Sequence, residues 1–348
     1  MRKNSVFIIF ILLFSLSFVA TAQVGGSSTY QFLNLPNSAR VAALGGNFLT
    51  IKDDDLSLAI ANPSLITPKM NQQIALSYIS YYADVNYGFA AYSRSFNKIG
   101  SFVGSLQYIN YGTFTAADAN GDKYGTFKAA EYALNIGWGR SLDSNFSIGS
   151  NLKTILSSLE TYSSFGLAVD IAATYQSKNK RFTTSLMFKN IGRQLSYYTE
   201  GNREALPFEI QLGLSERLKH APFRFSLLLN HLEKWDLTYE DPLNPSTKID
   251  PLTKDVITKS GFTKFGDNLL RHFVLGVEFI PSNNFNIRLG YNYQRRQEMK
   301  LESALSTVGF SWGFGFRVSK FNFSYAHVIQ NLAASSNFFT IATNLSTF

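Results

Sequence analysis

The sequence predicts an all-β protein, a 14-stranded antiparallel transmembrane β-barrel, on three observations. Apolar residues alternate with small or polar ones along many segments, the connections between these segments alternate between short and long, and the composition is aromatic-rich. Phe and Tyr account for 31 and 18 of the 348 residues, and charged residues make up only 16%, against about 25% in typical soluble domains. A barrel wall can direct such rings toward lipid.

The alternation has a period of two, which is typical of strands rather than helices. It is clearest in 165–175, 285–293 and 308–318, where one face carries large apolar residues and the other carries mostly small or polar ones. This is the apolar-out, polar-in pattern of a barrel wall. The predicted strands are 74–82, 85–96, 99–111, 128–142, 146–160, 164–176, 181–190, 208–219, 222–231, 271–280, 284–295, 305–318, 320–330 and 338–348.

The connections support the same fold. Turns such as 97–98 and 143–145 are short, whereas 112–127, 191–207 and 232–270 are long. Outer-membrane barrels have short periplasmic turns and long external loops, and a soluble sandwich, the alternative, has no reason to alternate them. The barrel is therefore predicted to span 71–348, with both of its ends on the periplasmic side and a long external loop at 232–270.

The first 22 residues are predicted to be a signal peptide. Arg2 and Lys3 precede an apolar run, and Ala20-Thr21-Ala22 supplies a small-residue cleavage site. A membrane anchor is the alternative, but the run is short. No later stretch of about 18 apolar residues exists. These features predict an exported chain in the outer membrane, in contact with outer-membrane lipid and lipopolysaccharide.

Residues 23–70 do not alternate and are predicted to fold into the lumen as a plug, because the wall side chains of so wide a barrel cannot fill it. Asp55 is expected to cap a short helix at 56–61, which ends before Pro63. The acidic triplet could be a metal or partner site. The favoured alternatives are a charge at a helix N-terminus or pairing with arginines of the inner wall; the cations of the short turns, such as Lys98 and Arg217, are one candidate source. The plug residues singled out are Arg40, Gly45, Gly46, Asp53, Asp54, Asp55, Asn62 and Pro63.

No catalytic, cofactor-binding or metal-binding residues are predicted, and the chain is not expected to be an enzyme. It has no cysteine and only four histidines, without a nucleophile-elbow or metal-ligand pattern. His231 and His272 flank the long loop and could meet at the outer rim, which leaves an enzyme site open. The net charge is +8, but the cations are scattered, so no nucleic-acid partner is expected.

Several stretches resemble the PorQ family, outer-membrane barrels of the type IX secretion system of Bacteroidetes. They are Gly25 to Pro36, Ser38-Ala39-Arg40 leading into Ala43 to Asn47, Asp53 to Asp55 with Asn62-Pro63, Phe265 to Phe273, and Gly290 to Glu298. The resemblance implies a FadL-like barrel, related to PorV, which anchors a cell-surface attachment complex. In that complex the PorQ family docks the surface protein PorZ, beside PorV and the sortase-like PorU.

Besides the enzyme site at the two histidines, two functions remain open. In the first, the barrel is a docking platform, and Trp235, Tyr239, Phe262 and Phe265 of the long loop are the candidate partner contacts, since rigid aromatic side chains often dominate interfaces. The loop could instead fold back over its own barrel mouth. In the second, the barrel is a FadL-type transporter of hydrophobic small molecules, and a wall without a lateral opening would count against it.

Overall fold

The structure is a computed structural model, and it describes residues 28–82, 85–238, 248–249, 256–257, 261–300, 307–331 and 334–348. The predicted signal peptide and Tyr239 lie outside the described residues.

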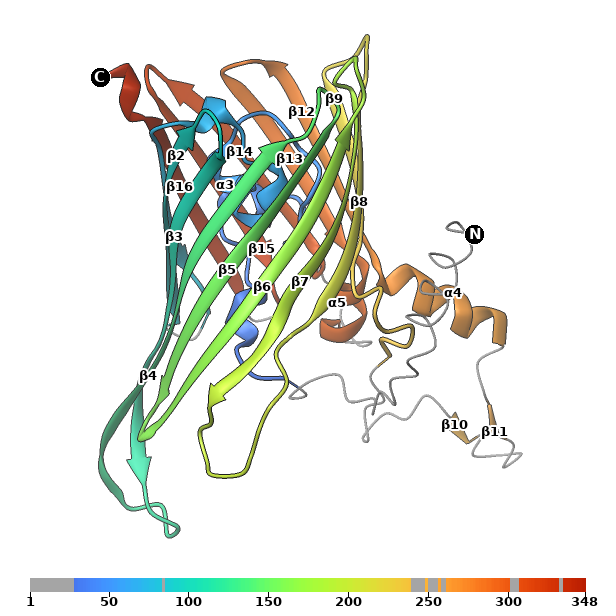
Figure 1. The fold of residues 1–348 in the computed structure, drawn as a ribbon. Helices are drawn as coiled ribbons and strands as arrows, with labels where there is room; N and C mark the ends of the chain where they lie inside the picture. Colours follow the sequence, from blue (N-terminus) through green and yellow to red (C-terminus); the bar gives the residue numbers. More distant parts are fainter. Residues whose placement is uncertain are drawn as a thin grey trace, which may run out of the picture.

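Fourteen strands in the described residues close into one antiparallel barrel, which confirms the predicted fold class (Figure 1). Each strand pairs with its sequence neighbours along the wall, and β1 closes the ring against β16. The strands are β1 (Gln73–Ser80), β2 (Asn86–Phe96), β3 (Gly100–Ala117), β4 (Lys123–Ser141), β5 (Phe146–Leu159), β6 (Tyr162–Gln176), β7 (Phe182–Ser196), β8 (Glu209–Arg217), β9 (Phe223–Leu229), β12 (Phe273–Ser282), β13 (Phe285–Asn292), β14 (Phe310–Val318), β15 (Phe321–Ile329) and β16 (Ser335–Asn344). A separate pair, β10 (Lys248–Ile249) and β11 (Val256–Ile257), lies in the long loop.

The two faces of the wall differ as the alternation predicts. Along β14, Phe310, Trp312 and Phe316 are exposed on the outer face, whereas Ser311 and Gly313 are buried on the inner face. The same pattern holds along β6, where the inner face carries Asp170 and Thr174. In these strands large apolar side chains thus face outward and small or polar ones face the lumen, the reverse of a soluble protein.

The two ends of the barrel differ in the length of their connections. The short turns and the C-terminus gather at one end, here called the short-turn rim (Figure 1). The long connections gather at the other end, the long-loop rim, where β3 and β4 project together beyond the wall. The predicted alternation of short and long connections holds only in part. The connections after β7 and β9 are long, but residues 160–161 alone join β5 to β6, and the predicted long loop 112–127 is mostly strand because β3 continues to Ala117 and β4 begins at Lys123. The assignment of the long-loop rim to the cell exterior stays a prediction.

Three strand predictions extend too far. Asn292 caps a helix, α5 (Tyr293–Met299), by accepting a hydrogen bond from the Arg295 amide, so β13 ends at that cap rather than at 295. β14 begins at Phe310 rather than at 305. Asn344 caps a 3-10 helix, η4 (Leu345–Thr347), in the same way, so Phe348 does not lie on the last strand. At these places a local side-chain cap or turn overrides the period-two pattern.

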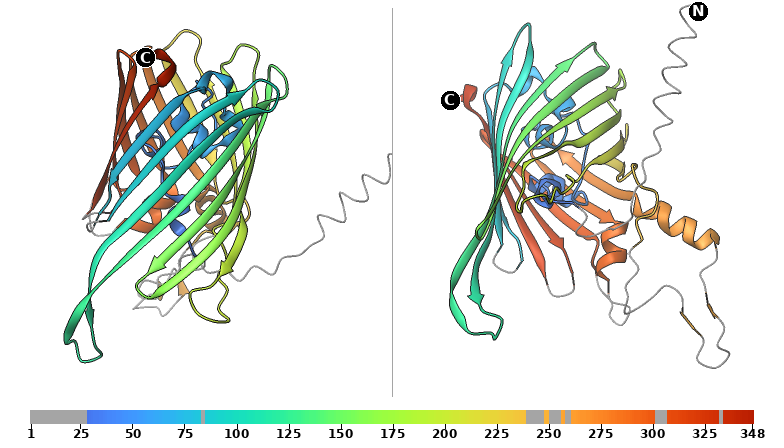
Figure 2. Two further views of the ribbon diagram at one scale, coloured as in Figure 1. Left: turned by 60° about the vertical axis from the view of Figure 1, so that its left-hand side comes forward. Right: turned by 60° about the horizontal axis from the view of Figure 1, so that its bottom comes forward.

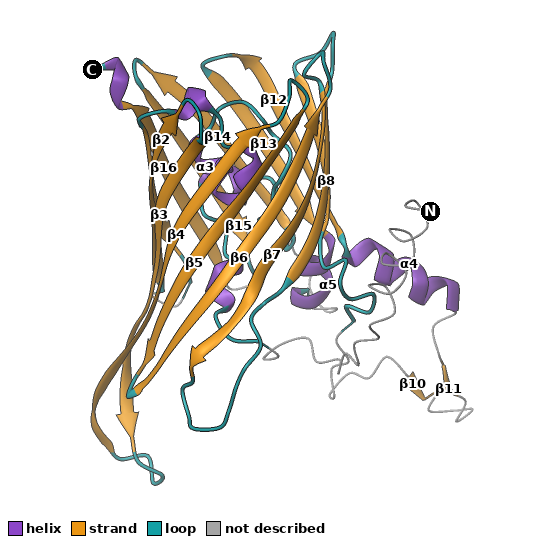
Figure 3. Ribbon diagram, viewed as in Figure 1, coloured by secondary structure: helices purple, strands orange, loops and turns teal. Residues whose placement is uncertain are grey.

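Residues 28–70 lie inside the barrel, as the right-hand view of Figure 2 shows, with the bottom of the barrel turned forward. This luminal segment consists of short helices, drawn purple within the ring of strands in Figure 3: η1 (Gln31–Asn34), α2 (Ala39–Ala43), α3 (Leu56–Ala61), η2 (Pro63–Leu65) and η3 (Pro68–Met70). Asp55 caps α3 and Asn62 is extended before Pro63, as the sequence predicts. No helix in the described part of the chain is long and apolar enough to cross a membrane.

Inward glycines let the luminal segment lie against the wall. A Cβ at Gly149 of β5 would overlap the carbonyl group of Pro63, and one at Gly290 of β13 would overlap the backbone at Gly45. Buried apolar side chains of the segment, including Leu56, Leu65 and Met70, pack with Phe89 and Val103 of the wall. The lumen is therefore a packed core over much of its height rather than an open pore.

Candidate functional site

A cluster of charges, buried at Glu278 and its arginine partners but open to the lumen at Asp53 and Asp55, fastens the luminal segment to one side of the wall. Arg40 of α2 donates from Nε to Glu278 Oε1 at 2.9 Å, from Nη2 to Asp53 Oδ2 at 2.6 Å and from Nη1 to Asp55 Oδ2 at 2.9 Å. Glu278 of β12 also accepts hydrogen bonds from Arg224 of β9 at 2.8 Å and Arg288 of β13 at 3.1 Å.

The cluster balances three arginines, Arg40, Arg224 and Arg288, against the three carboxylates of Asp53, Asp55 and Glu278. Buried charges are tolerated when they are paired in this way. Burial raises the pKa of Asp53, but Arg40 and Arg224 outweigh it, and the net shift is downward.

This geometry answers the question that the acidic triplet raised. Asp53 and Asp55 pair with arginines, while Asp54 accepts from Thr67 Oγ1 at 2.7 Å and Lys69 Nζ at 3.1 Å. The idea that cations of the short turns hold these acids is wrong for the described residues, because their ion-pair partners are Arg40, Arg224 and Lys69. Arg40 and Lys69 belong to the luminal segment itself, so the positions of cations in the turns did not predict the partners of these acids. In the described part of the chain, no group of three or more His, Asp or Glu side chains is placed to hold a metal ion.

The other predicted luminal residues shape close contacts. Gly45 and Gly46 have φ of 105° and 99°, a region that favours glycine. A Cβ on Gly45 would overlap Val274, and one on Gly46 would lie 2.7 Å from Arg295 Nη2. The Asn62 side chain donates to the Leu49 carbonyl at 2.7 Å.

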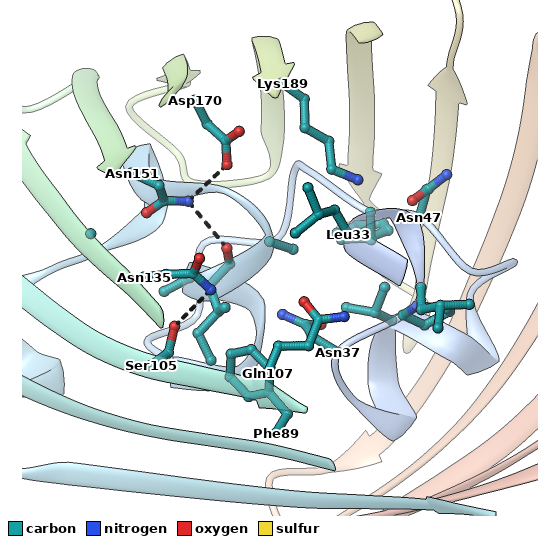
Figure 4. Close-up of a pocket in the computed structure, with 18 of the residues that line it drawn as sticks. Leu33, Asn37, Asn47, Phe89, Ser105, Gln107, Asn135, Asn151, Asp170 and Lys189 are labelled. Carbon is teal, nitrogen blue, oxygen red and sulfur yellow. Dashed lines mark hydrogen bonds between the residues drawn. The ribbon is translucent and has the colours of Figure 1, made fainter. Parts of the chain in front are cut away.

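A small cavity remains between the luminal segment and strands β2 to β8, and Figure 4 shows it. The segment lines it with apolar residues such as Leu33 and Phe48, and the wall with polar ones such as Gln107 and Asn135. Its volume is about 60 Å³, whereas a cavity of about 150 Å³ holds one benzene molecule. In this arrangement the cavity has no room for an aromatic solute.

Beside this cavity two neighbouring strands of the wall are only partly hydrogen-bonded to each other. β7 pairs with β8 from Phe182 to Lys189, but beyond a bulge at Asn190, residues 191–196 of β7 pair with β6 alone. Asn190, at a left-handed φ of 57°, receives a hydrogen bond from Lys153 and donates one to the Pro207 carbonyl at 2.9 Å. An open pocket of about 540 Å³ lies at the gap, lined in part by residues 203–206. The sequence did not indicate this gap, because β7 and β8 read as ordinary strands.

The long-loop rim carries the predicted aromatic contacts. The structure brings Trp235 and Phe265 together, with ring centroids 5.2 Å apart, and leaves Phe262 87% exposed. Phe262 and Phe265 belong to an unpredicted helix, α4 (Gly261–Arg271), whose Asp267 accepts a hydrogen bond from the Tyr293 hydroxyl of α5. The spacing of Phe262, Phe265 and Leu269 was the signal for this helix.

The backbones of the two histidines that flank the long loop lie close together. The amide of Asn230, the residue before His231, donates a hydrogen bond to the His272 carbonyl. The ring nitrogens of His272 face the backbone carbonyls of Asn230 and Trp235. Burial lowers the pKa of His231, but Glu233 and Glu209 outweigh it and the net shift is upward. Both histidines thus have structural partners, and no nucleophilic side chain is hydrogen-bonded to either in the described residues.

Comparison with known proteins points to one fold. No protein-family model matches the sequence, and no curated protein matches it. The solved Ralstonia pickettii toluene transporter TbuX overlaps 89% of this chain and 98% of its own, with a TM-score of 0.51 and 9% identity. The chain has a FadL-like outer-membrane barrel fold. A mutant of the monoaromatic hydrocarbon channel TodX gives the same TM-score over 89% of this chain and 97% of its own, with 11% identity.

At these identities the FadL-like barrel shares its fold with those proteins and nothing finer. A Pseudomonas aeruginosa FadL homologue also aligns over 93% of this chain and 100% of its own, with a TM-score of 0.42 and 10% identity. The similar structures are transporters and channels rather than enzymes. The fold is that of proteins of the bacterial outer membrane, which agrees with the predicted location.

Proposed function

We propose that this chain is a non-enzymatic outer-membrane barrel that holds a surface protein at its long-loop rim, as its resemblance to the PorQ family implies. The observation that carries the proposal is a lumen filled by residues 28–70 beneath a rim of exposed rings. Trp235, Phe262 and Phe265 are 49%, 87% and 53% exposed, and such rings are favoured anchors of protein interfaces. The partner would be a PorZ-like surface protein, with PorU and PorV in the same complex.

The test is affinity capture from intact outer membranes, followed by mass spectrometry. The variant is F262A combined with F265A, which removes two rings without touching the barrel wall. The matched control is F146A at the short-turn rim, where Phe146 is 49% exposed. We expect the double variant to recover at least tenfold less surface partner than the wild type, and F146A to recover the same amount. Equal recovery by all three barrels would refute docking through these rings.

A second candidate function is FadL-type transport of hydrophobic small molecules. The observation that favours it is the gap between β7 and β8 beside the luminal cavity, since a transporter of this kind is expected to have a lateral opening in its wall. The named functions of TbuX and TodX are closer to this candidate than to docking. The 60 Å³ cavity argues against it unless the luminal segment moves.

Uptake of labelled toluene and palmitate by a Gram-negative host that lacks its own fatty-acid barrel tests this second candidate. Leu206 is buried at the gap, so the uptake rate through the L206A barrel should be several-fold higher than through the wild-type barrel. The control, L186A, changes an outward side chain on the paired part of β7 and should leave the rate unchanged. Uptake no faster than in the empty host would exclude transport of these solutes.

A further inference from the structure

A half-buried arginine without a full set of partners lies at the long-loop rim, over the mouth of the lumen. Arg295 belongs to α5, which turns inward from the end of β13 because Asn292 caps it. Its Nη2 atom lies against Gly46 of the luminal segment. Its Nη1 atom is buried and has no hydrogen-bond partner. A guanidinium has five N–H donors and no way to lose its charge, so an unpaired buried nitrogen is costly.

The rest of the barrel shows that this chain pairs its buried arginines. Arg40, Arg224 and Arg288 all contact the Glu278 carboxylate. Arg295 has no ion pair of this kind in the described residues, and the nearest acid of its own helix, Glu298, accepts a hydrogen bond from Gln294. Burial lowers the pKa of Arg295. The missing anion at Arg295 is therefore an exception that calls for an explanation.

Arg295 lines a pocket of about 230 Å³, which is larger than the space needed by one six-membered ring. Two tyrosines form one part of its lining, with the ring centroids of Tyr81 and Tyr82 4.4 Å apart. The other polar lining residues include the amides Asn292, Gln294 and Gln330. Amide side chains both donate and accept hydrogen bonds, which suits hydroxyl groups, and aromatic rings offer an apolar face with a polar tip.

We propose that this pocket binds an anionic saccharide, a sugar ring that carries a carboxylate or a phosphate. The anionic group pairs with the Arg295 guanidinium, whose planar shape is well suited to a carboxylate or a phosphate. The sugar ring lies against Tyr81 and Tyr82, and its hydroxyls bond to the side-chain amides of Gln294 and Gln330. Glu298, also in the lining, is exposed and can accept a further hydroxyl. The pocket uses none of the rings of the proposed docking surface, so the two proposals stand or fall separately.

The test measures binding of glucuronate, glucose 6-phosphate, glucose and inorganic phosphate to the full barrel in detergent by titration calorimetry. We expect the two anionic sugars to bind, glucose to bind at least tenfold more weakly, and inorganic phosphate to bind more weakly than the sugar phosphate. R295Q should weaken binding of both anionic sugars at least tenfold, and R295K should restore part of it. The matched control R193Q changes an exposed arginine of β7 and should bind like the wild type.

Y82A provides a second variant that leaves the charge in place. It should weaken binding of glucose 6-phosphate but not of inorganic phosphate, because only the sugar has a ring to contact. If purified lipopolysaccharide competes with glucuronate, the proposal is supported and the natural ligand is a saccharide of the cell surface. If glucuronate binds without such competition, the proposal is supported and the natural ligand is a free saccharide. No binding of either anionic sugar, or equal binding by the wild type and R295Q, would overturn it.

Discussion

The charge cluster at Glu278 makes the most demanding prediction about what holds the luminal segment in place. The E278Q substitution keeps the size of the side chain but removes the negative charge that three arginines share. Glu278 is 0% exposed and Arg288 is 3% exposed, so the substitution leaves the arginine charges without a partner at a buried position. Breaking a buried ion pair by removing one member costs about 3–5 kcal/mol. We expect E278Q to lower the free energy of unfolding by at least about 3 kcal/mol.

The assay is guanidinium unfolding of the barrel in lipid vesicles, read by tryptophan fluorescence, with limited proteolysis of residues 28–70 in parallel. E216Q is the matched control, since it makes the same Glu-to-Gln change at an exposed position of β8. The double variant R40Q/E278Q should lose less than the sum of the two single variants, by about 1–3 kcal/mol, because Arg40 and Glu278 contact each other directly. A difference between E278Q and E216Q below about 1 kcal/mol would refute the argument that this cluster anchors the segment.

Two further predictions concern the same segment. G149A should destabilise the barrel by about 1–3 kcal/mol, since its Cβ would overlap Pro63, whereas G104A should be near neutral because nothing lies within 4 Å of its Cβ; equal melting temperatures for the two variants would contradict this packing. The pKa of Asp53 lies below its ordinary value of 3.8, so its stabilisation is present above that pH and is lost as pH falls through the lower folded value. Residues 28–70 should therefore become sensitive to pepsin below about pH 4, and D53N should be sensitive already at higher pH; a pH-independent digestion pattern in the wild type would sink the claim.

The wall of this protein could be read from the sequence because its rule is local. In a strand that faces lipid on one side and the lumen on the other, every second residue must be apolar, and the alternation along 165–175 and 308–318 records this requirement. All fourteen strands were predicted, and the errors fell at strand ends such as 293–295, where the Asn292 cap begins a helix. The cap of α3 by Asp55 was also a local signal.

The tertiary structure decided everything that depends on distant residues. Arg40 meets Glu278 across 238 positions of sequence, and no local pattern indicates which acid on the wall faces which arginine of the luminal segment. Three other features likewise arise only when the barrel closes around residues 28–70. They are the end of β7 that does not pair with β8, the close approach of Gly149 to Pro63, and the unpaired Nη1 of Arg295. The period of two along each strand is set by the lipid on one side of the wall and the lumen on the other. The contacts inside the lumen are set by which distant side chains the closed barrel brings together.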